Sequence, residues 1–138
     1  MHYWILKTEP TTYSMGDLKR DGKTAWDGVR NYQARNNLAS MKQDDRCFIY
    51  HSVGPKEIVG TARVVKSAYP DVTAGDPRWV CVDICFEKAL TRPVKLEELK
   101  SHPRLKNISL VHQGRLSVSP ISKADWDEII ALSSSHEP

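Results

Sequence analysis

Three strand-like runs separated by turn residues occupy the middle of the chain, and they limit the possible folds more than any other feature. The runs cover residues 47–51, 57–65 and 79–86 and are rich in β-branched and aromatic side chains. Gly54-Pro55 separates the first two, and a loop over 70–77 rich in Asp, Gly and Pro separates the last two. The strand–helix–strand rhythm of a parallel α/β fold is therefore not expected.

Shorter elements flank this middle. We expect a first strand over residues 3–7 and a last strand over 116–119. Short helical segments are expected from Ser14, over 31–41, over 96–99 and from Ser122, and a further short element of unassigned type from residue 110. Together these elements predict an α+β fold, a small mixed β-barrel of about five or six strands with flanking short helices.

The length of 138 residues predicts one domain, which we place over residues 1–132, followed by a flexible C-terminal tail over 133–138. Hydrophobic residues make up 40% of the chain and charged residues 27%, as is usual for a globular domain with a core. No apolar run approaches the ~18 residues of a spanning helix, so no membrane partner is expected. Residues 1–4 lead directly into the first strand, so we expect no signal peptide. The expected location is the cytoplasm of a bacterium, or the nucleus in a eukaryote.

Patterns for catalysis and metal binding are sparse. Cys81 and Cys85 lie about 13 Å apart along one strand, too far to share a zinc ion with bonds of ~2.3 Å. The histidines show no close ligand spacing, so no metal and no cofactor are expected. His51-Ser52 suggests a base and a nucleophile, but neighbouring strand residues point to opposite faces. If the strand ends at His51, Ser52 can turn inward, where a hydrogen-bonding role is favoured over a nucleophilic one.

Residues 26–37, with the sequence WDGVRNYQARNN, combine two aromatic rings, two guanidiniums, three Asn and a Gly. Gly28 allows a tight bend, and Asn31 is a favourable N-cap for the helix that follows. Trp26 precedes the bend, where its ring can face an opening. The functional interpretation is a loop and helix that line a pocket for a flat, polar ligand. The alternative is an ordinary helix start with a core Trp and a solvated polar face.

Two further polar segments adjoin strand ends, residues 50–52 and residues 113–117. Either their side chains form the hydrogen bonds that turns and buried polar groups require, or they converge with residues 26–36 into one site. Together they would offer a stacking ring worth ~1–3 kcal/mol per base, hydrogen-bonding partners for a base edge, and Arg side chains for phosphate. The net charge of +3 permits a nucleic-acid partner without requiring one.

Four segments together resemble the EVE domain family. They are YWILKTEP (residues 3–10), WDGVRNYQARNN (26–37), YHS (50–52) and RLSV (115–118), and the resemblance runs from about residue 1 to residue 132. The second segment is the most specific. Residues 111–113, Val-His-Gln, depart from the family pattern, in which we expect a more basic residue before the Gln.

The resemblance implies a PUA-like fold, related to the YTH domains that read methylated adenine in RNA and to ASCH domains. It also implies a base pocket in which Trp26 is a wall and Val29 and Asn31 line the floor. Ser52 would form a hydrogen bond with the edge of the base. The base-pocket residues implied in this way are Trp26, Gly28, Val29, Asn31, Tyr50, Ser52 and Ser117. The residues implied at the mouth or against the nucleic-acid backbone are Lys7, Arg30, Arg35, Asn36 and Arg115.

The hypothesis from the sequence is a non-catalytic module that reads a methylated or otherwise modified cytosine or adenine in DNA or RNA. It needs no cofactor and is assumed to be a monomer. One alternative is an ASCH-like hydrolase acting on RNA or modified nucleosides, with Lys7, Ser52 and Arg115 as its polar pocket groups. The other is a protein-interaction module or small-molecule sensor, which the near-neutral charge permits.

Overall fold

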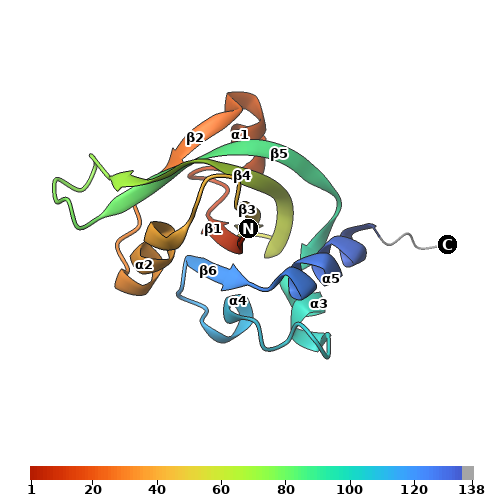
Figure 1. Cartoon of the computed structure of the whole chain (residues 1–138). Helices are drawn as coiled ribbons and strands as arrows, with labels where there is room; N and C mark the ends of the chain where they lie inside the picture. Colours follow the sequence, from red (N-terminus) through yellow and green to blue (C-terminus); the bar gives the residue numbers. More distant parts are fainter. Residues whose placement is uncertain (135–138) are drawn as a thin grey trace.

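The computed structural model describes residues 1–134. Its strands are β1 (Tyr3–Thr8), β2 (Lys23–Trp26), β3 (Arg46–His51), β4 (Glu57–Pro70), β5 (Val80–Lys95) and β6 (Val118–Ile121). Its helices are α1 (Met15–Asp21), α2 (Tyr32–Ser40), α3 (Leu96–Ser101), α4 (Ser109–His112) and α5 (Lys123–Ser134). Figure 1 shows β4 and β5 as one long hairpin that extends past the rest of the sheet.

The strands form one six-stranded sheet in the order β2-β5-β4-β3-β1-β6. Neighbouring strands are antiparallel except β1 and β3, which are parallel. The prediction of a mixed α+β fold with flanking short helices is confirmed. The predicted barrel describes the sheet only approximately, because β2 and β6 are its two edges and the sheet does not close between them.

The β4–β5 hairpin bends because its register shifts at several points, and such bulges increase local twist. Gly60 lies at one of these shifts. A Cβ at this position would overlap the Met15 side chain and lie 2.9 Å from the Lys88 carbonyl oxygen. The sequence prediction of a bulge or close backbone approach at Gly60 is confirmed, and the approach lets α1 pack against the sheet.

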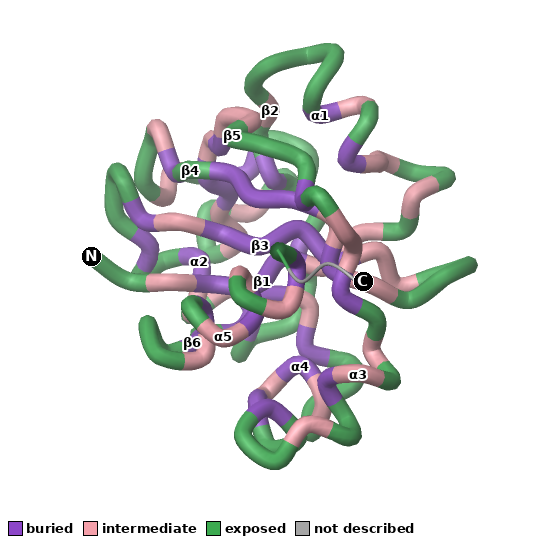
Figure 2. Tube along the Cα trace, turned by 90° about the vertical axis from the view of Figure 1, so that its right-hand side faces the viewer, coloured by how far each residue is buried: buried purple, intermediate pink, exposed green. Residues whose placement is uncertain are grey.

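Both faces of the sheet are buried, which explains the nearly continuous apolar runs in its central strands. Alternate residues of β1 show this clearly: Leu6 packs into a core with α1 and α2, while Ile5 packs into a second core with α3, α4 and α5. Figure 2 shows the resulting buried stretches along β1, β3 and β4.

The helix ends follow local capping chemistry. The Ser14 hydroxyl accepts from the Asp17 amide at 3.0 Å, and the Asp17 carboxylate accepts from the Ser14 amide at 2.9 Å, so the predicted capping pair is present. At the other end of the chain α5 continues through Ser134, and Ser133 is buried. The first two residues of the expected tail are therefore helical, and its remainder, residues 135–138, lies outside the described residues.

Several strand boundaries differ from the sequence predictions. Residues 23–26 form the edge strand β2, paired with β5, although no strand was expected there. β5 extends to Lys95 rather than ending at residue 86, because its second half pairs with the start of β4. β6 covers Val118–Ile121 rather than residues 116–119, and β4 continues to Pro70 rather than ending at residue 65. In the first two cases a partner strand distant in sequence stabilises residues whose own β-propensity is modest.

Candidate functional site

A cavity of about 450 Å³ lies beside β1, β2 and the loop that connects β2 to α2. This volume falls in the range of small-molecule binding sites, roughly 300–1,000 Å³. Most of the lining residues are of polar type, but the surface they present is about equally polar and apolar, and Ala25, Trp26 and Val29 contribute apolar side chains to it. The lining residues are Lys7, Thr8, Thr12, Tyr13, Thr24, Ala25, Trp26, Asp27, Gly28, Val29, Arg30, Asn31 and Ser117.

Trp26 is both a core residue and a wall of this cavity. Its side chain is buried, with 8% of the residue exposed, and it belongs to the same core as Val29 and Leu38. The Tyr13 ring meets the indole edge-on, with ring centroids 6.4 Å apart. The two interpretations of Trp26 drawn from the sequence are therefore compatible, because the core fixes the plane of a ring that also borders the cavity.

The loop between β2 and α2 is held in place by Asp71, which follows β4. The Asp71 carboxylate is buried and accepts from the Gly28 amide at 2.9 Å, from Arg30 Nη1 at 3.1 Å and from the Thr73 amide at 2.8 Å. Burial opposes ionisation, but these hydrogen bonds outweigh it and lower the pKa of Asp71 to about 2. Gly28 has φ +80°, a left-handed conformation that favours glycine, so the predicted bend is confirmed.

Asn31 connects this loop to α2. Its side-chain oxygen accepts from the Ala34 amide at 2.9 Å, so the predicted N-cap is confirmed. Because the helix uses the oxygen, the side-chain Nδ2 is the group that can donate to a ligand in the cavity.

Lys7 borders the cavity from β1. Its Nζ donates to the Gly114 carbonyl at 2.6 Å and lies 5.9 Å from the centroid of the Tyr50 ring. Its backbone amide donates to the Ser117 carbonyl at 2.9 Å, which places Ser117 in the lining. Partial burial, and secondarily the charge of Lys56, lower the pKa of the Lys7 ammonium.

The structure gathers seven of the twelve residues implied by the family resemblance around the cavity: Lys7, Trp26, Gly28, Val29, Arg30, Asn31 and Ser117. The other five lie outside its lining. Tyr50 is buried beneath Lys7, and Ser52 donates from its amide and its hydroxyl to the Thr8 carbonyl, at 3.0 and 3.3 Å. Ser52 thus continues the pairing of β3 with β1 outside the lining, and its contact with a base edge stays a prediction. Three polar residues lie farther out, with exposed or half-buried side chains: Arg35, Asn36 and Arg115.

His51 and Ser52 do not form a catalytic pair. His51 Nε2 accepts from the Met15 amide at 3.1 Å, at the start of α1. Burial lowers the pKa of His51, and the charge of Glu57 opposes this only in part. His51 is therefore a neutral acceptor that orients α1 beside the cavity.

Acidification is expected to weaken the fold through His51. Protonation converts the Nε2 acceptor into a donor and removes a hydrogen bond worth about 1 kcal/mol. Because the pKa of His51 is lowered on folding, its contribution is complete above the unfolded-state pKa of ~6.5 and is lost as pH falls below it. Urea unfolding at pH 8 and pH 5 measures the effect. In His51→Gln the amide oxygen still accepts, so this variant should lose less stability over that interval. Equal losses in both proteins would contradict the role of His51.

Within residues 1–134 no helix is long and apolar enough to cross a bilayer. In the same part of the chain, no three His, Cys, Asp or Glu side chains come together in an arrangement suited to a metal ion. Cys47 and Cys81 are buried free thiols, and burial raises the pKa of each.

Comparison with known proteins agrees with this geometry. The profile of the EVE domain matches residues 2–132 of the chain. The chain belongs to the EVE family. This EVE domain is 38% identical to mouse thymocyte nuclear protein 1 over 165 aligned residues, which cover 95% of the chain and 73% of the relative.

Solved structures extend the comparison to the fold of the EVE domain. A protein from Agrobacterium tumefaciens is 40% identical with a TM-score of 0.95, covering 100% of this chain and 97% of the other. The human THYN1 protein, solved in complex with DNA containing 5-methylcytosine, is 33% identical with a TM-score of 0.93. The match covers 99% of this chain and 100% of the other. An ASCH protein from Zymomonas mobilis has a TM-score of 0.66 at 15% identity, covering 99% of each chain, which shows a related fold alone.

Several cavity residues of the EVE domain were not identified from the sequence. Asp27 lies inside the most specific motif, so its position in the chain was the available signal. Thr8 likewise lies inside a quoted motif, residues 3–10, whereas three other missed polar lining residues carry no local signal: Thr12, Tyr13 and Thr24. Asp71 was also missed, because it lies in a loop of ordinary turn composition far from Gly28 in the sequence.

Proposed function

We propose that this EVE domain is a non-catalytic reader of a modified base in nucleic acid, with the base inserted into the cavity beside Trp26. The cavity is the main support, since it combines one fixed indole with hydrogen-bonding groups from Asp27, Asn31 and Ser117. The human THYN1 complex with 5-methylcytosine DNA adds support from a relative. We therefore take 5-methylcytosine in DNA as the first ligand, with modified adenine and RNA as further ones.

The energies are compatible with base insertion. Turning a base out of its stack costs a few kcal/mol. Stacking on an aromatic ring returns ~1–3 kcal/mol, and two or three hydrogen bonds add about 1 kcal/mol each. Trp26 suits this role because the core already fixes its ring, so little side-chain entropy is lost on binding.

Asp27 and Asn31 offer complementary groups for a base edge. A carboxylate such as that of Asp27 accepts from the exocyclic amino group of cytosine, and adenine also carries such an amino group. The Nδ2 of Asn31 donates to a ring nitrogen or carbonyl. Thymine has a carbonyl where cytosine has its amino group, so the cavity should favour cytosine over thymine.

A methyl group on the base would lie against the apolar part of the lining, formed by Ala25, Trp26 and Val29. One methyl group contributes about 1–3 kcal/mol of discrimination in a hydrophobic pocket. The modified base should therefore bind roughly 5- to 150-fold more tightly than its unmodified counterpart.

Cationic side chains around the mouth would contact the nucleic-acid backbone. Lys7 and Arg30 line the cavity, and Arg35 and Arg115 lie beyond its lining, on α2 and before β6. Asn36 can add a neutral hydrogen bond from α2. A monomer carries all of these groups. It would meet its ligand in a bacterial cytoplasm or in a eukaryotic nucleus.

A binding screen tests this function. DNA and RNA oligonucleotides of one sequence, carrying cytosine, 5-methylcytosine, thymine or modified adenine, are titrated by fluorescence anisotropy at several salt concentrations. We expect preference for the modified base and affinity that falls as salt rises. Asp27→Asn should reduce the preference for cytosine over thymine without loss of stability, because Asp27 is exposed. Asp127→Asn on α5 removes a carboxylate that is likewise exposed, and it should change neither the preference for cytosine over thymine nor the stability.

Two results would contradict the reader function. Equal affinity for modified and unmodified oligonucleotides, with Asp27→Asn indistinguishable from wild type, would remove the cavity as a base site. Cleaved RNA or released nucleoside after incubation would indicate the hydrolase alternative, whereas a reader retains its oligonucleotide unchanged.

A further inference from the structure

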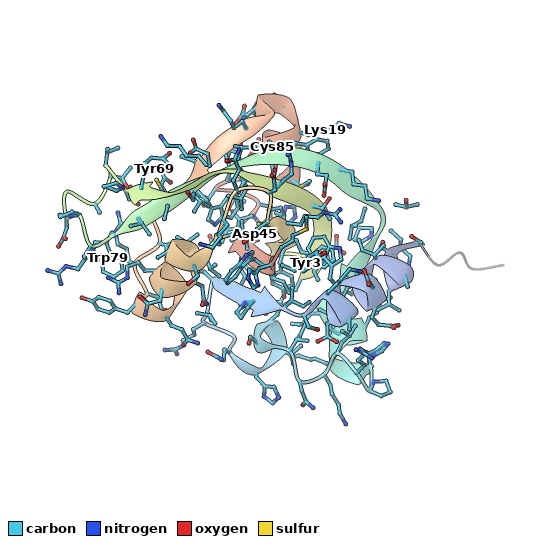
Figure 3. All side chains as sticks on the ribbon, viewed as in Figure 1. Tyr3, Lys19, Asp45, Tyr69, Trp79 and Cys85 are labelled. Carbon is cyan, nitrogen blue, oxygen red and sulfur yellow. The ribbon has the colours of Figure 1, made fainter. Side chains whose placement is uncertain are left out.

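A cluster of rings and guanidiniums lies beside the cavity and is not explained by base insertion. It joins the loop before α2, the first turn of α2 and the end of the loop between β4 and β5. We name it the aromatic–arginine cluster, and its members are Arg30, Tyr32, Arg35, Arg78 and Trp79. Figure 3 shows Trp79 at the far end of the β4–β5 hairpin, next to α2.

The two rings of the cluster pack against each other at a tilt, and both are partly accessible, since Trp79 is half-buried. The ring centroids of Tyr32 and Trp79 lie 4.9 Å apart with planes inclined by 33°. Tyr32 is 53% exposed, which is high for a large aromatic residue at the start of a helix. The two rings therefore support each other while leaving part of their surface open to solvent.

Guanidiniums surround these rings. Arg35 lies 5.3 Å from the centroid of the Tyr32 ring, and Arg30 lies 6.0 Å from that of Trp79. Arg78 Nη1 donates to the Tyr32 hydroxyl at 3.1 Å. Among residues 1–134, Arg35 makes no salt bridge to a carboxylate, so its charge is available to an anion.

Arg30 connects the cluster to the cavity. It lines the cavity, pairs with Asp71 and lies against Trp79. Tyr32 follows Asn31, another lining residue, directly in the chain. A nucleotide next to one inserted beside Trp26 would therefore lie close to this cluster.

We propose that the aromatic–arginine cluster is a second nucleic-acid contact, in which Tyr32 and Trp79 stack the base next to the inserted one and Arg35 and Arg78 bind the flanking phosphates. Alternating aromatic and cationic side chains bind strands in this way with little regard to sequence, because every base has a stacking face. The inference rests on the proposed nucleic-acid function and assigns to it a surface outside the base cavity.

Tyr32→Ala and Tyr32→Phe test the stacking contact. We expect Tyr32→Ala to weaken binding about 5- to 150-fold, as the loss of one stacked base predicts. The loss should be equal for DNA with cytosine and with 5-methylcytosine, so their ratio stays unchanged. Tyr32→Phe keeps the ring and should bind nearly as wild type does. Thermal unfolding of each variant checks that the fold is intact, as we expect for a substitution at a half-exposed position.

An abasic nucleotide placed beside the 5-methylcytosine locates the stacked base. On one of the two sides of the 5-methylcytosine, the abasic nucleotide should weaken binding by the wild-type protein. The affinity of Tyr32→Ala should stay unchanged there, because the variant has no stacked base to lose. Arg78→Gln should reduce the slope of log affinity against log salt concentration by about the amount expected for one lost phosphate contact. Arg104→Gln is the matched control, since Arg104 is similarly exposed, also pairs with one carboxylate and lies away from the cavity.

The outcomes separate this inference from the reader function. Wild-type affinity in a folded Tyr32→Ala variant that still prefers 5-methylcytosine would overturn the stacking contact alone. Weakened binding in that variant, with no preference for 5-methylcytosine in wild type, would support the cluster and overturn the reader function.

Discussion

Trp26→Ala is expected to abolish binding of a 5-methylcytosine oligonucleotide and to lower the free energy of unfolding by about 3–5 kcal/mol. The loss of stability follows because Trp26 is nearly buried in the core beneath α1 and α2. The loss of binding follows because the indole is the stacking wall of the cavity. Denaturant unfolding and anisotropy, the latter at a temperature where the variant is folded, measure the two effects.

Trp26→Phe separates these two roles of the indole. A smaller ring retains part of the core packing, so we expect about 1–3 kcal/mol of destabilisation and a severalfold loss of affinity. Trp126→Phe is the matched control, because Trp126 is 1% exposed in the other core and stacks on Phe48 with centroids 3.8 Å apart. It should destabilise the fold and leave binding unchanged. Equal effects of the two substitutions on affinity would show that Trp26 acts through stability alone.

Asp71→Asn should lower the free energy of unfolding by about 2–4 kcal/mol and weaken oligonucleotide binding at least tenfold. Both carboxylate oxygens are in use, one by Gly28 and Arg30 and the other by Thr73. An amide replaces one acceptor oxygen with a donor, so one of these sets of donors loses its partner. The loop between β2 and α2 would then no longer be held against the cavity.

The pH dependence of unfolding gives a second measure of Asp71. Its pKa falls from an unfolded value of ~3.9 to about 2 on folding. Its contribution of about 2.5 kcal/mol is therefore complete above pH ~5 and is lost as pH falls toward 2. Asp71→Asn should lack this part of the acid dependence, while Asp125→Asn, beside the exposed Arg104, should retain it. An unchanged slope in Asp71→Asn would contradict the role of this carboxylate.

Features that depend on neighbouring residues in the chain were predictable. Asn31 caps α2 because its own side chain reaches an amide three residues later. Gly28 bends the chain because it tolerates a positive φ. A Gly inside the strand-like run at residue 60 indicated a bulge or a close backbone approach, although which residue approaches it, Met15, is set by the fold. In each case the chemistry of one residue type limits the backbone, whatever the remaining fold.

The site was only partly predictable, for a related reason. Lining residues within 26–31, except Asp27, were found because one continuous loop carries them. Ser52 was assigned to the base edge, but pairing along β1 directs it to the Thr8 carbonyl. Tyr32 received no role, because its significance appears only when the β4–β5 hairpin brings Trp79 against its ring.

The amino-acid sequence alone determined most of the extended and helical segments, where they bend, and which short motif contains the ligand-facing loop, since these properties arise from side chains acting on their own backbone. Tertiary structure decided that the sheet stays open, that β2 joins it, and that Asp71 and Trp79 lie beside residues 28–32. Those contacts join residues more than forty positions apart. Their geometry depends on strand pairing and core packing, which no local pattern specifies.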